Sequence, residues 1–237
     1  MKTAKRRVLI FSILFSLSIA TPSYAAEDFN TYQHTLVPLY LWGVSVDGTM
    51  NGLGLNIEFS DAVSDLEAIF TVHYEGAKGN WGVILDYSFL NLGPTGTIPP
   101  STPVSVDFKN KIAEAVALYR FGPNNPWELL GGVRYYKVDI TVNLGPGTNF
   151  NESLTDLIVG GRYNGKLSDK WSLLARADIG TGDSDVVWNA AVIFDYRFTK
   201  LLSGFAGYRV LDYDVDEPNF KYKVNHSGPL LALAFHW

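Results

Sequence analysis

Cysteine is absent from the 237 residues of this sequence. Its absence excludes disulfide bonds, and it also excludes a lipid-modified cysteine at the start of an exported chain. Charged residues are sparse, at 18% of the chain, whereas aromatic residues make up 14%. That balance is unusual for a soluble exported protein and favours a chain surrounded by lipid.

Long apolar runs are lacking beyond the amino terminus. The first seven residues include four basic ones, and an apolar run from Val8 to Ala20 and small residues up to Ala26 follow. This order is typical of a secretory signal peptide. The run is too short for a helix that crosses a bilayer, which needs about 20 apolar residues. We therefore predict a signal peptide at residues 1–25, cleaved after Ala25, and one mature domain at residues 26–237.

Positive charge is also scarce in the predicted mature chain. Cleavage after Ala25 removes four of the 19 basic residues and no acidic ones, which leaves 15 basic against 24 acidic residues, a net charge of −9. A strongly acidic chain argues against a nucleic-acid partner, because DNA and RNA are themselves polyanions.

Side chains in the mature region alternate with a period of two residues, and the carboxyl terminus is one example. Four bulky residues share one strand face: Leu231, Leu233, Phe235 and Trp237. The residues between them are small or polar. Such a strand suits a wall between lipid and a packed interior. An alternating apolar strand that ends in an aromatic residue is also similar to the carboxyl-terminal assembly signal of bacterial outer-membrane barrels.

The alternation predicts ten strands. Their approximate ranges are 33–47, 67–77, 81–92, 105–121, 127–142, 153–165, 171–180, 186–198, 201–213 and 220–237. Short turns and longer loops alternate between them, the longest loops being 48–66, 93–104 and 143–152. Outer-membrane barrels have short periplasmic turns and long outer loops. The sequence thus predicts an all-β, transmembrane antiparallel up-and-down barrel of about ten strands, with eight or twelve as alternatives.

The first long loop needs a separate interpretation. Residues 51–59 alternate like a strand, yet an eleventh membrane strand would give an odd total and reverse the rhythm of short and long connections. We predict a hairpin arm beyond the membrane there. Residues 60–67 are predicted to form a short helical turn, because Ser64 and Glu67 have the spacing of a capping box.

Aromatic residues gather beside the predicted short turns. The predicted aromatic girdle consists of Trp81, Trp127, Trp171, Tyr196, Phe198 and Trp237. Indole and phenol rings prefer the boundary between lipid and water, which explains this placement at one rim of the barrel.

An outward apolar face places the charged residues inside the barrel. The predicted network in the lumen comprises Glu75, Asp86, Glu114, Arg120, Glu128, Arg134, Asp156, Arg162, Arg176, Asp178, Asp195, Arg197 and Arg209. Buried charges must be paired or hydrated. Two interpretations stay open: a closed core of ion pairs, or a thin water-filled path whose selectivity these charges set.

Catalytic and metal-binding patterns are weak. Of the four histidines only His226, beside Ser227, is predicted near the outer rim, and adjacent residues point to opposite faces of a strand. The acidic run Asp212, Asp214 and Asp216 lacks the glycine turn and the bidentate Glu of a calcium loop, so we interpret it as solvated. The sequence predicts no enzyme activity, no catalytic residues, no cofactor and no metal.

Several strand ends and turns carry a family resemblance. These are Tyr40-Leu41-Trp42, Asp47-Gly48-Thr49, Gly79-Asn80-Trp81-Gly82, Leu130-Gly131-Gly132-Val133-Arg134-Tyr135 and Gly228-Pro229-Leu230-Leu231. Together with the signal peptide they resemble an uncharacterised family of small Gram-negative outer-membrane barrels, similar in class to the OmpA-like and OmpW-like barrels. The motifs are structural, so the resemblance implies an architecture and carries no activity.

The expected role is that of a monomeric outer-membrane barrel, structural or passive, with narrow permeation left open. A surface-loop binding or adhesion module is the first alternative, and a hydrolase at the outer rim is the second. The expected partners are the lipid bilayer, lipopolysaccharide and, through the carboxyl-terminal strand, the outer-membrane assembly machinery.

Overall fold

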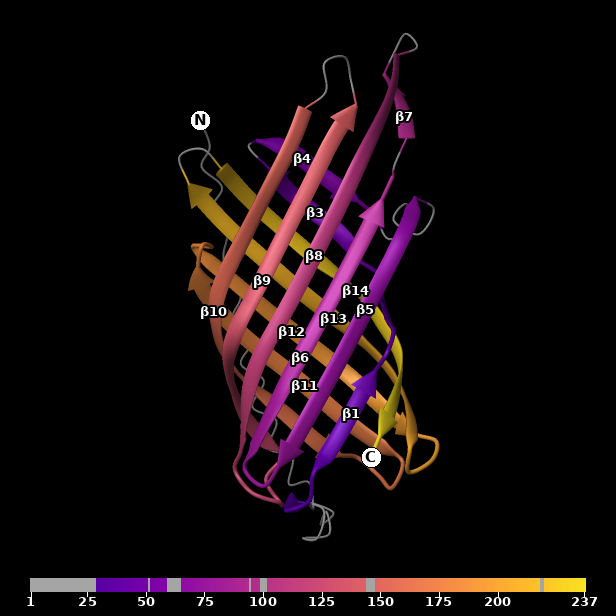
Figure 1. Ribbon diagram of the computed structural model, residues 1–237, viewed down its shortest axis with the longest axis vertical. Helices are drawn as coiled ribbons and strands as arrows, with labels where there is room; N and C mark the ends of the chain where they lie inside the picture. Colours follow the sequence, from indigo (N-terminus) through magenta and orange to yellow (C-terminus); the bar gives the residue numbers. More distant parts are fainter. Residues whose placement is uncertain are drawn as a thin grey trace, which may run out of the picture.

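The computed structural model describes residues 29–50, 52–58, 65–93, 95–98, 102–143, 148–217 and 220–237. These residues form fourteen strands in one antiparallel sheet that closes on itself (Figure 1). Within them, no helix is long and apolar enough to cross a membrane. The signal peptide predicted at residues 1–25 lies outside the described residues.

Ten antiparallel segments make up the wall of the barrel, and each is termed a stave, whether it is one strand or several short strands in line. The first stave consists of three short strands, β1 (Gln33–Val37), β2 (Tyr40–Trp42) and β3 (Ser45–Met50). The other nine are β5 (Leu66–Lys78), β6 (Trp81–Leu92), β8 (Thr102–Arg120), β9 (Trp127–Asn143), β10 (Thr148–Lys166), β11 (Trp171–Gly182), β12 (Val186–Arg197), β13 (Leu202–Glu217) and β14 (Phe220–His236). Each stave pairs with the next, and β14 pairs back onto all three strands of the first. The predicted up-and-down barrel of ten strands is confirmed.

The two remaining strands are side arms of the wall. In the described part of the chain, β4 (Leu53–Ile57) pairs with β3 alone, and β7 (Thr95–Ile98) pairs with β8 alone. The hairpin arm predicted at residues 51–59 is therefore confirmed for residues 53–57. Residues 60–64 of the predicted helical turn lie outside the described residues, and Glu67 belongs to β5.

The prediction of loops at 93–104 and 143–152 is wrong. Strand β8 already begins at Thr102, β9 continues to Asn143, and β10 begins again at Thr148. Antiparallel neighbours continue to satisfy each other's backbone N–H and C=O groups beyond the membrane. Seven of the fourteen described residues in these two ranges are Thr or Asn, so the apolar alternation that signals a membrane strand is weak there although the pairing continues.

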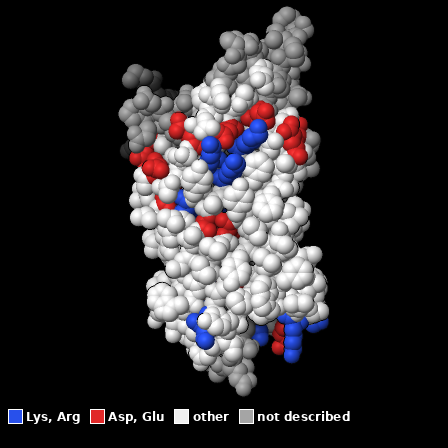
Figure 2. Space-filling model, viewed as in Figure 1, with Lys and Arg blue, Asp and Glu red and all other residues white. Residues whose placement is uncertain are grey.

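The outer surface of the barrel is apolar over a broad band. The exposed apolar side chains on the staves include Leu85, Val133, Leu157, Val159, Ile179, Val192, Phe194, Leu231 and Leu233. On the face shown in Figure 2, uncharged residues dominate the lower half, and charged side chains gather above it and at the lower end. This distribution matches the lipid-facing belt of a membrane barrel.

A local break interrupts the pairing between the first stave and β5. Their ladder ends at Val37 opposite His73, just before Pro38, which has no backbone N–H to contribute. The hydroxyl of Thr71 then replaces the ladder: it accepts a bond from Tyr40 N at 2.7 Å and donates one to Tyr40 O at 2.6 Å. Beyond this point the first stave no longer pairs with β5: its strand β3 pairs with β14 and β4, while β5 remains paired with β6.

We expect Thr71→Val to destabilise the barrel by about 1–3 kcal/mol, because it leaves two buried backbone groups of Tyr40 without a partner. Urea unfolding of the protein in lipid vesicles measures this difference. Thr49→Val, at an exposed position of β3, is the matched control and is expected to leave the midpoint unchanged. Equal midpoints for Thr71→Val and the parent would show that the hydroxyl does not close this break.

Candidate functional site

The interior of the barrel contains a central ionic layer around Glu114 of β8. Its carboxylate accepts hydrogen bonds from three guanidinium groups: Arg134 Nε at 3.0 Å, Arg176 Nη2 at 2.8 Å and Arg209 Nη2 at 2.7 Å. Asp178 accepts from Arg134 at 2.8 Å and from Arg176 at 2.7 Å. Arg134 is fully buried. Side chains from β8, β9, β11 and β13 therefore meet across the lumen.

A second ionic cluster lies around Arg162 of β10, nearer the short turns. Its two terminal nitrogens donate to Glu75 of β5 at 2.6 and 2.7 Å, and its Nε donates to Glu128 of β9. The Arg162 side chain is 2% exposed, so this bidentate pair is largely removed from water. Bidentate geometry of this kind makes a guanidinium–carboxylate pair both strong and directional.

Five residues of the predicted network lie apart from these clusters. Asp86 accepts from the Tyr40 hydroxyl at 2.9 Å and contacts His73 Nδ1 at 3.0 Å. The other four bond to uncharged groups: Arg120 to Gln33 and Gly79, Asp156 to Ser184, Asp195 to Ser203, and Arg197 to the carbonyl of Lys200. Some of these bonds join neighbouring staves, as His73 to Asp86 does, whereas Arg120–Gln33 joins β8 to β1 and Tyr40–Asp86 joins β2 to β6. Which staves a side chain connects cannot be read from residue type.

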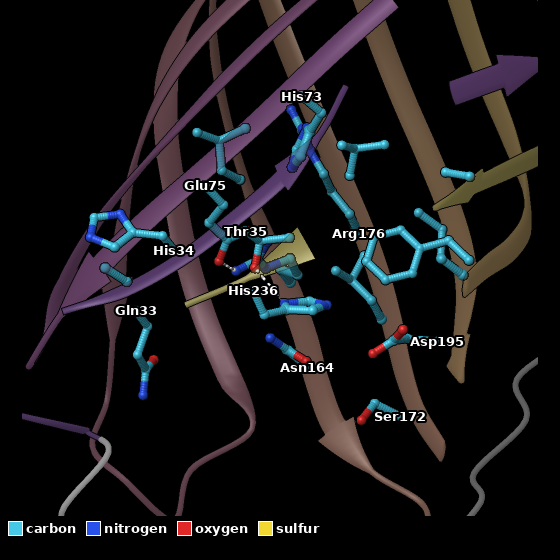
Figure 3. A pocket seen from close by; sticks show the side chains of 18 of the residues that line it. Gln33, His34, Thr35, His73, Glu75, Asn164, Ser172, Arg176, Asp195 and His236 are labelled. Atoms are coloured by element: carbon cyan, nitrogen blue, oxygen red, sulfur yellow. Dashed lines mark hydrogen bonds and ion pairs between the residues drawn. The ribbon is translucent and has the colours of Figure 1, made fainter. Parts of the chain in front are cut away.

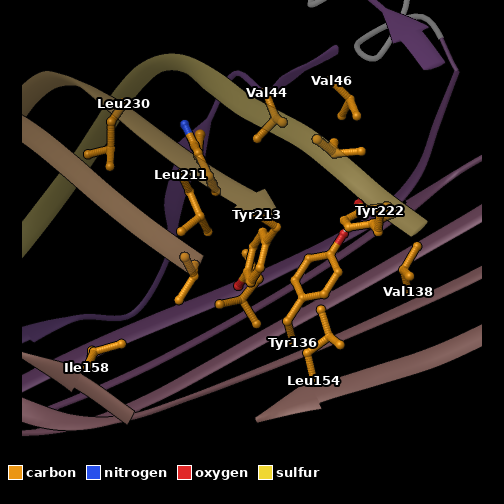
Figure 4. Close-up of a cluster of buried hydrophobic side chains, with 14 of the residues drawn as sticks. Val44, Val46, Tyr136, Val138, Leu154, Ile158, Leu211, Tyr213, Tyr222 and Leu230 are labelled. Atoms are coloured by element: carbon orange, nitrogen blue, oxygen red, sulfur yellow. The ribbon is translucent and has the colours of Figure 1, made fainter. Parts of the chain in front are cut away.

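An apolar and aromatic layer fills the outer half of the lumen. Tyr136 lies at its centre, with its hydroxyl 2.5 Å from that of Tyr222 and 3.3 Å from His226 Nε2 (Figure 4). The Tyr213 ring packs on Tyr136 with centroids 4.4 Å apart. Aliphatic and aromatic residues surround them, among them Phe108, Ile112, Val138, Ile140, Leu154, Leu211, Val215 and Val224.

This layer is not among the sequence predictions. Apolar residues were predicted on the lipid face and charged residues in the interior, whereas the outer half of the interior is largely apolar. A narrow barrel has to be filled with its own side chains, and close packing there favours rings and branched aliphatic groups. The signal was present, because continuing the inward-facing positions of β9 past Arg134 leads to Tyr136, Val138 and Ile140.

The structure also removes His226 from the rim site considered for a hydrolase. Its side chain is 2% exposed and faces the aromatic layer, while Asp212 bonds instead to Asn225 at 3.0 Å. Another serine–histidine pair does form, Ser203 Oγ with His236 Nε2 at 2.7 Å. Ser203 is fully buried, and the second ring nitrogen of His236 meets the Thr35 hydroxyl at 3.1 Å rather than a carboxylate. The contact between His236 and Thr35 joins β14 to β1, where the sheet closes, whereas Ser203 lies on the adjacent strand β13.

The acidic outer hairpin of β13 and β14 pairs with lysines of the same hairpin. Lys223 Nζ lies 3.0 Å from Asp214, and Lys221 Nζ lies 2.6 Å from Asp216. The hydrogen bond from Lys221 lowers the pKa of Asp216, and Asp214 raises the pKa of Lys223. Among the described residues, no three His, Cys, Asp or Glu side chains come together in a way that could hold a metal ion.

The predicted girdle residues lie at the short-turn end. Trp81 packs against Tyr119 at 5.1 Å between ring centroids, Trp127 against Tyr163 at 5.3 Å, and Trp171 against Tyr196 at 4.9 Å. Phe198 packs on Tyr196, and Trp237 stacks on His34. Four of the predicted six, Trp81, Trp127, Phe198 and Trp237, are each more than half exposed. Of the assembly-signal residues, Leu231, Leu233 and Phe235 face outward like Trp237.

A cavity of about 740 Å³ occupies the inner half of the lumen, between the ionic layer and the short turns (Figure 3). Charged residues of β5, β8, β9 and β10 line one side, among them Glu75, Glu128 and Arg162. The other side, from β11 to β14, contributes the apolar residues Leu174, Ile193, Phe205, Leu230 and Ala232 together with the charged residues Arg176, Asp195, Arg197 and Arg209.

Comparison with known proteins does not assign this chain to a family. No protein-family model matches the chain, and no curated protein matches it. The solved structures that it resembles include the translocator domain of the autotransporter NalP from Neisseria meningitidis, with 13% identity over 89% of this chain and 92% of that one, at a TM-score of 0.49. They also include Ail, the attachment invasion locus protein of Yersinia pestis, with 13% identity over 87% and 97% of the two chains, at a TM-score of 0.42.

A third similar structure is Neisserial surface protein A, with 13% identity over 86% of this chain and 95% of that one, at a TM-score of 0.36. All three are outer-membrane β-barrels. The expected resemblance to outer-membrane barrels holds at the level of architecture, which the closed strand order establishes on its own. Identities this low transfer no activity to this chain.

We expect Glu114→Gln to destabilise the barrel by about 3–5 kcal/mol, because it leaves three buried guanidinium groups with too little negative charge. Urea unfolding in lipid vesicles again provides the measurement. Asp214→Asn removes an exposed partner of Lys223 and is expected to have no measurable effect. If the two variants unfold alike, the central ionic layer does not hold the staves together.

Proposed function

We propose that this chain is an integral barrel of the bacterial outer membrane with a structural role and a sealed lumen. Its apolar outer band and the aromatic rings at one rim support the membrane setting. In this proposal lipopolysaccharide surrounds the outer half, the assembly machinery engages β14, and the barrel is a monomer. The short turns then face the periplasm.

The observation that carries this proposal is the double seal inside the barrel. Glu114, Arg134 and Asp178 form a layer of ion pairs whose side chains are at most 1% exposed. The aromatic layer around Tyr136 lies directly beyond it on the same stave, β9. A conducting path needs water to continue from one end to the other, and these two stacked layers interrupt it.

We expect the folded protein to give no current steps in a planar bilayer across a range of voltages. The variant Glu114→Ala/Arg134→Ala/Tyr136→Ala removes side chains of both layers from two neighbouring staves, and it is expected to give open steps once gel mobility shows that it has folded. Steps from the parent protein whose ion preference changes with Arg176→Ala would refute the sealed lumen and support the narrow pore.

A second candidate function is surface binding by the outer hairpins. A membrane strand needs about 9–11 residues, whereas β8 and β10 have 19 residues each and β9 has 17. In Figure 1 these strands, with β7, rise above the staves on the other side of the barrel. A purely structural barrel has no need of such extensions.

Deleting residues 95–103 removes β7 and the start of β8 and tests this second candidate. We expect the truncated barrel to fold and to lose binding to a panel of immobilised proteins and polysaccharides. Deleting residues 53–57, the β4 arm, is the control for loss of a hairpin elsewhere on the rim. Unchanged binding after the first deletion would reject the binding function and leave the structural role as the only candidate.

A further inference from the structure

The cavity at the short-turn end has the size of a ligand site. Its volume of about 740 Å³ lies within the roughly 300–1,000 Å³ typical of small-molecule pockets. The ionic layer around Glu114 forms its inner end, and it opens among the short turns, where Lys170 and Lys200 line its mouth. A molecule can therefore reach it from one side of the membrane only.

Positive charge predominates in this cavity, although the chain as a whole is acidic. The lining includes eight Arg and Lys residues against six Asp and Glu residues, while the full chain carries a net charge of −5. The deep arginines, Arg162, Arg176 and Arg209, all pair with carboxylates. The excess of cations therefore lies near the mouth, where Lys170, Arg197 and Lys200 line the opening.

The mouth is the part of the cavity where charge is least compensated by carboxylates. Arg197 donates to the carbonyl of Lys200 at 3.2 Å, and Lys170 lies over the Tyr196 ring at 5.9 Å. The acidic residues at the same end are Asp169 and Asp195, and Asp195 is hydrogen-bonded to Ser203 and interacts with Arg197. Lys170 and Lys200 are the exposed cations of the mouth. An anion that enters here meets several donors within one short stretch of the rim.

One wall of the cavity is apolar at intermediate depth. Leu174, Ile193 and Phe205 project from β11, β12 and β13, and Leu230 and Ala232 continue this wall on β14. A space that only hydrated the buried ion pairs would be lined by polar groups, because ordered water needs two to four polar partners. An apolar wall between a cationic mouth and an ionic inner end instead suits a molecule with an apolar body.

We propose that this cavity binds a small amphipathic anion, with its carboxylate or phosphate at the Lys170–Lys200 mouth and its apolar body against the wall of Leu174, Ile193 and Phe205. This site adds a ligand to the sealed barrel proposed above, and its periplasmic location rests on the orientation proposed there. Because the lumen is sealed beyond the ionic layer, the ligand is held and released on the same side.

The test uses the full mature barrel in lipid nanodiscs and isothermal titration calorimetry. The probe is 4-phenylbutyrate, a soluble carboxylate with an aromatic body, and empty nanodiscs correct for partitioning into lipid. We expect saturable binding of 4-phenylbutyrate. Binding of the neutral 4-phenylbutanamide and of inorganic phosphate, each of which lacks one half of the recognised chemistry, is expected to be at least tenfold weaker.

Variants locate the site. Lys170→Gln/Lys200→Gln removes two exposed cations of the mouth and is expected to weaken 4-phenylbutyrate binding at least fivefold. Lys78→Gln removes an exposed cation at the same rim that does not line the cavity, and it is expected to leave binding unchanged. Ile193→Asn places a polar group in the apolar wall and is expected to weaken binding as well, with folding checked by gel mobility.

Three results would overturn the proposal: no heat above that of empty nanodiscs, inorganic phosphate binding as tightly as 4-phenylbutyrate, or equal weakening by Lys78→Gln and the double variant. The conductance measurement stays independent of all of them. A silent barrel that binds nothing refutes the ligand site alone, and a conducting barrel refutes the seal alone.

Discussion

Closure of the sheet is the constraint on which the rest of the structure depends. In lipid, a strand edge with unpaired N–H and C=O groups costs several kcal/mol per group, so the first and last staves must meet. Here β14 pairs with β1, β2 and β3 in turn, and Trp237 exchanges backbone bonds with His34 at 2.9 and 3.2 Å. The first stave consists of three separate strands and still completes the wall. The Thr71 side chain provides the hydrogen bonds to the backbone of Tyr40 that the backbone of β5 does not provide.

Closing ten staves creates an interior that must be filled, and the protein fills it in two chemically different ways. Around Glu114 the filling is ionic, and its arginines come from staves on different sides of the barrel. Around Tyr136 it is aromatic and aliphatic. Buried ion pairs add less stability than their geometry suggests, since desolvation offsets much of the attraction. Their specific partners nevertheless tie distant staves at one height, while the apolar layer contributes most of the burial.

The two ends of the barrel differ as a result. Toward the long hairpins the lumen is filled by buried aromatic and aliphatic side chains, and toward the short turns it contains a cavity lined by charged residues and by an apolar cluster that includes Leu174, Ile193 and Phe205. The contrast arises because inward-facing positions near the short turns are occupied by small or polar residues such as Ala77, Asn164 and Ser172. Inward-facing positions nearer the long hairpins are occupied by aromatic residues. A barrel that served only as a wall would gain stability from filling both halves.

The sequence by itself determined the stave number, the sidedness of most strands and the presence of aromatic rings beside the short turns, because a period of two and the residues that flank a turn are local properties of the chain. It also identified the β4 arm by parity alone. It placed Asp156 and Arg197 in one network with Arg134, and it left the aromatic layer and the cavity unseen. Those features depend on the register of one stave against another and on which side chains meet across the lumen. Only the closed tertiary structure decided them, because the height of a residue in the barrel comes from strand tilt and pairing rather than from its neighbours in the sequence.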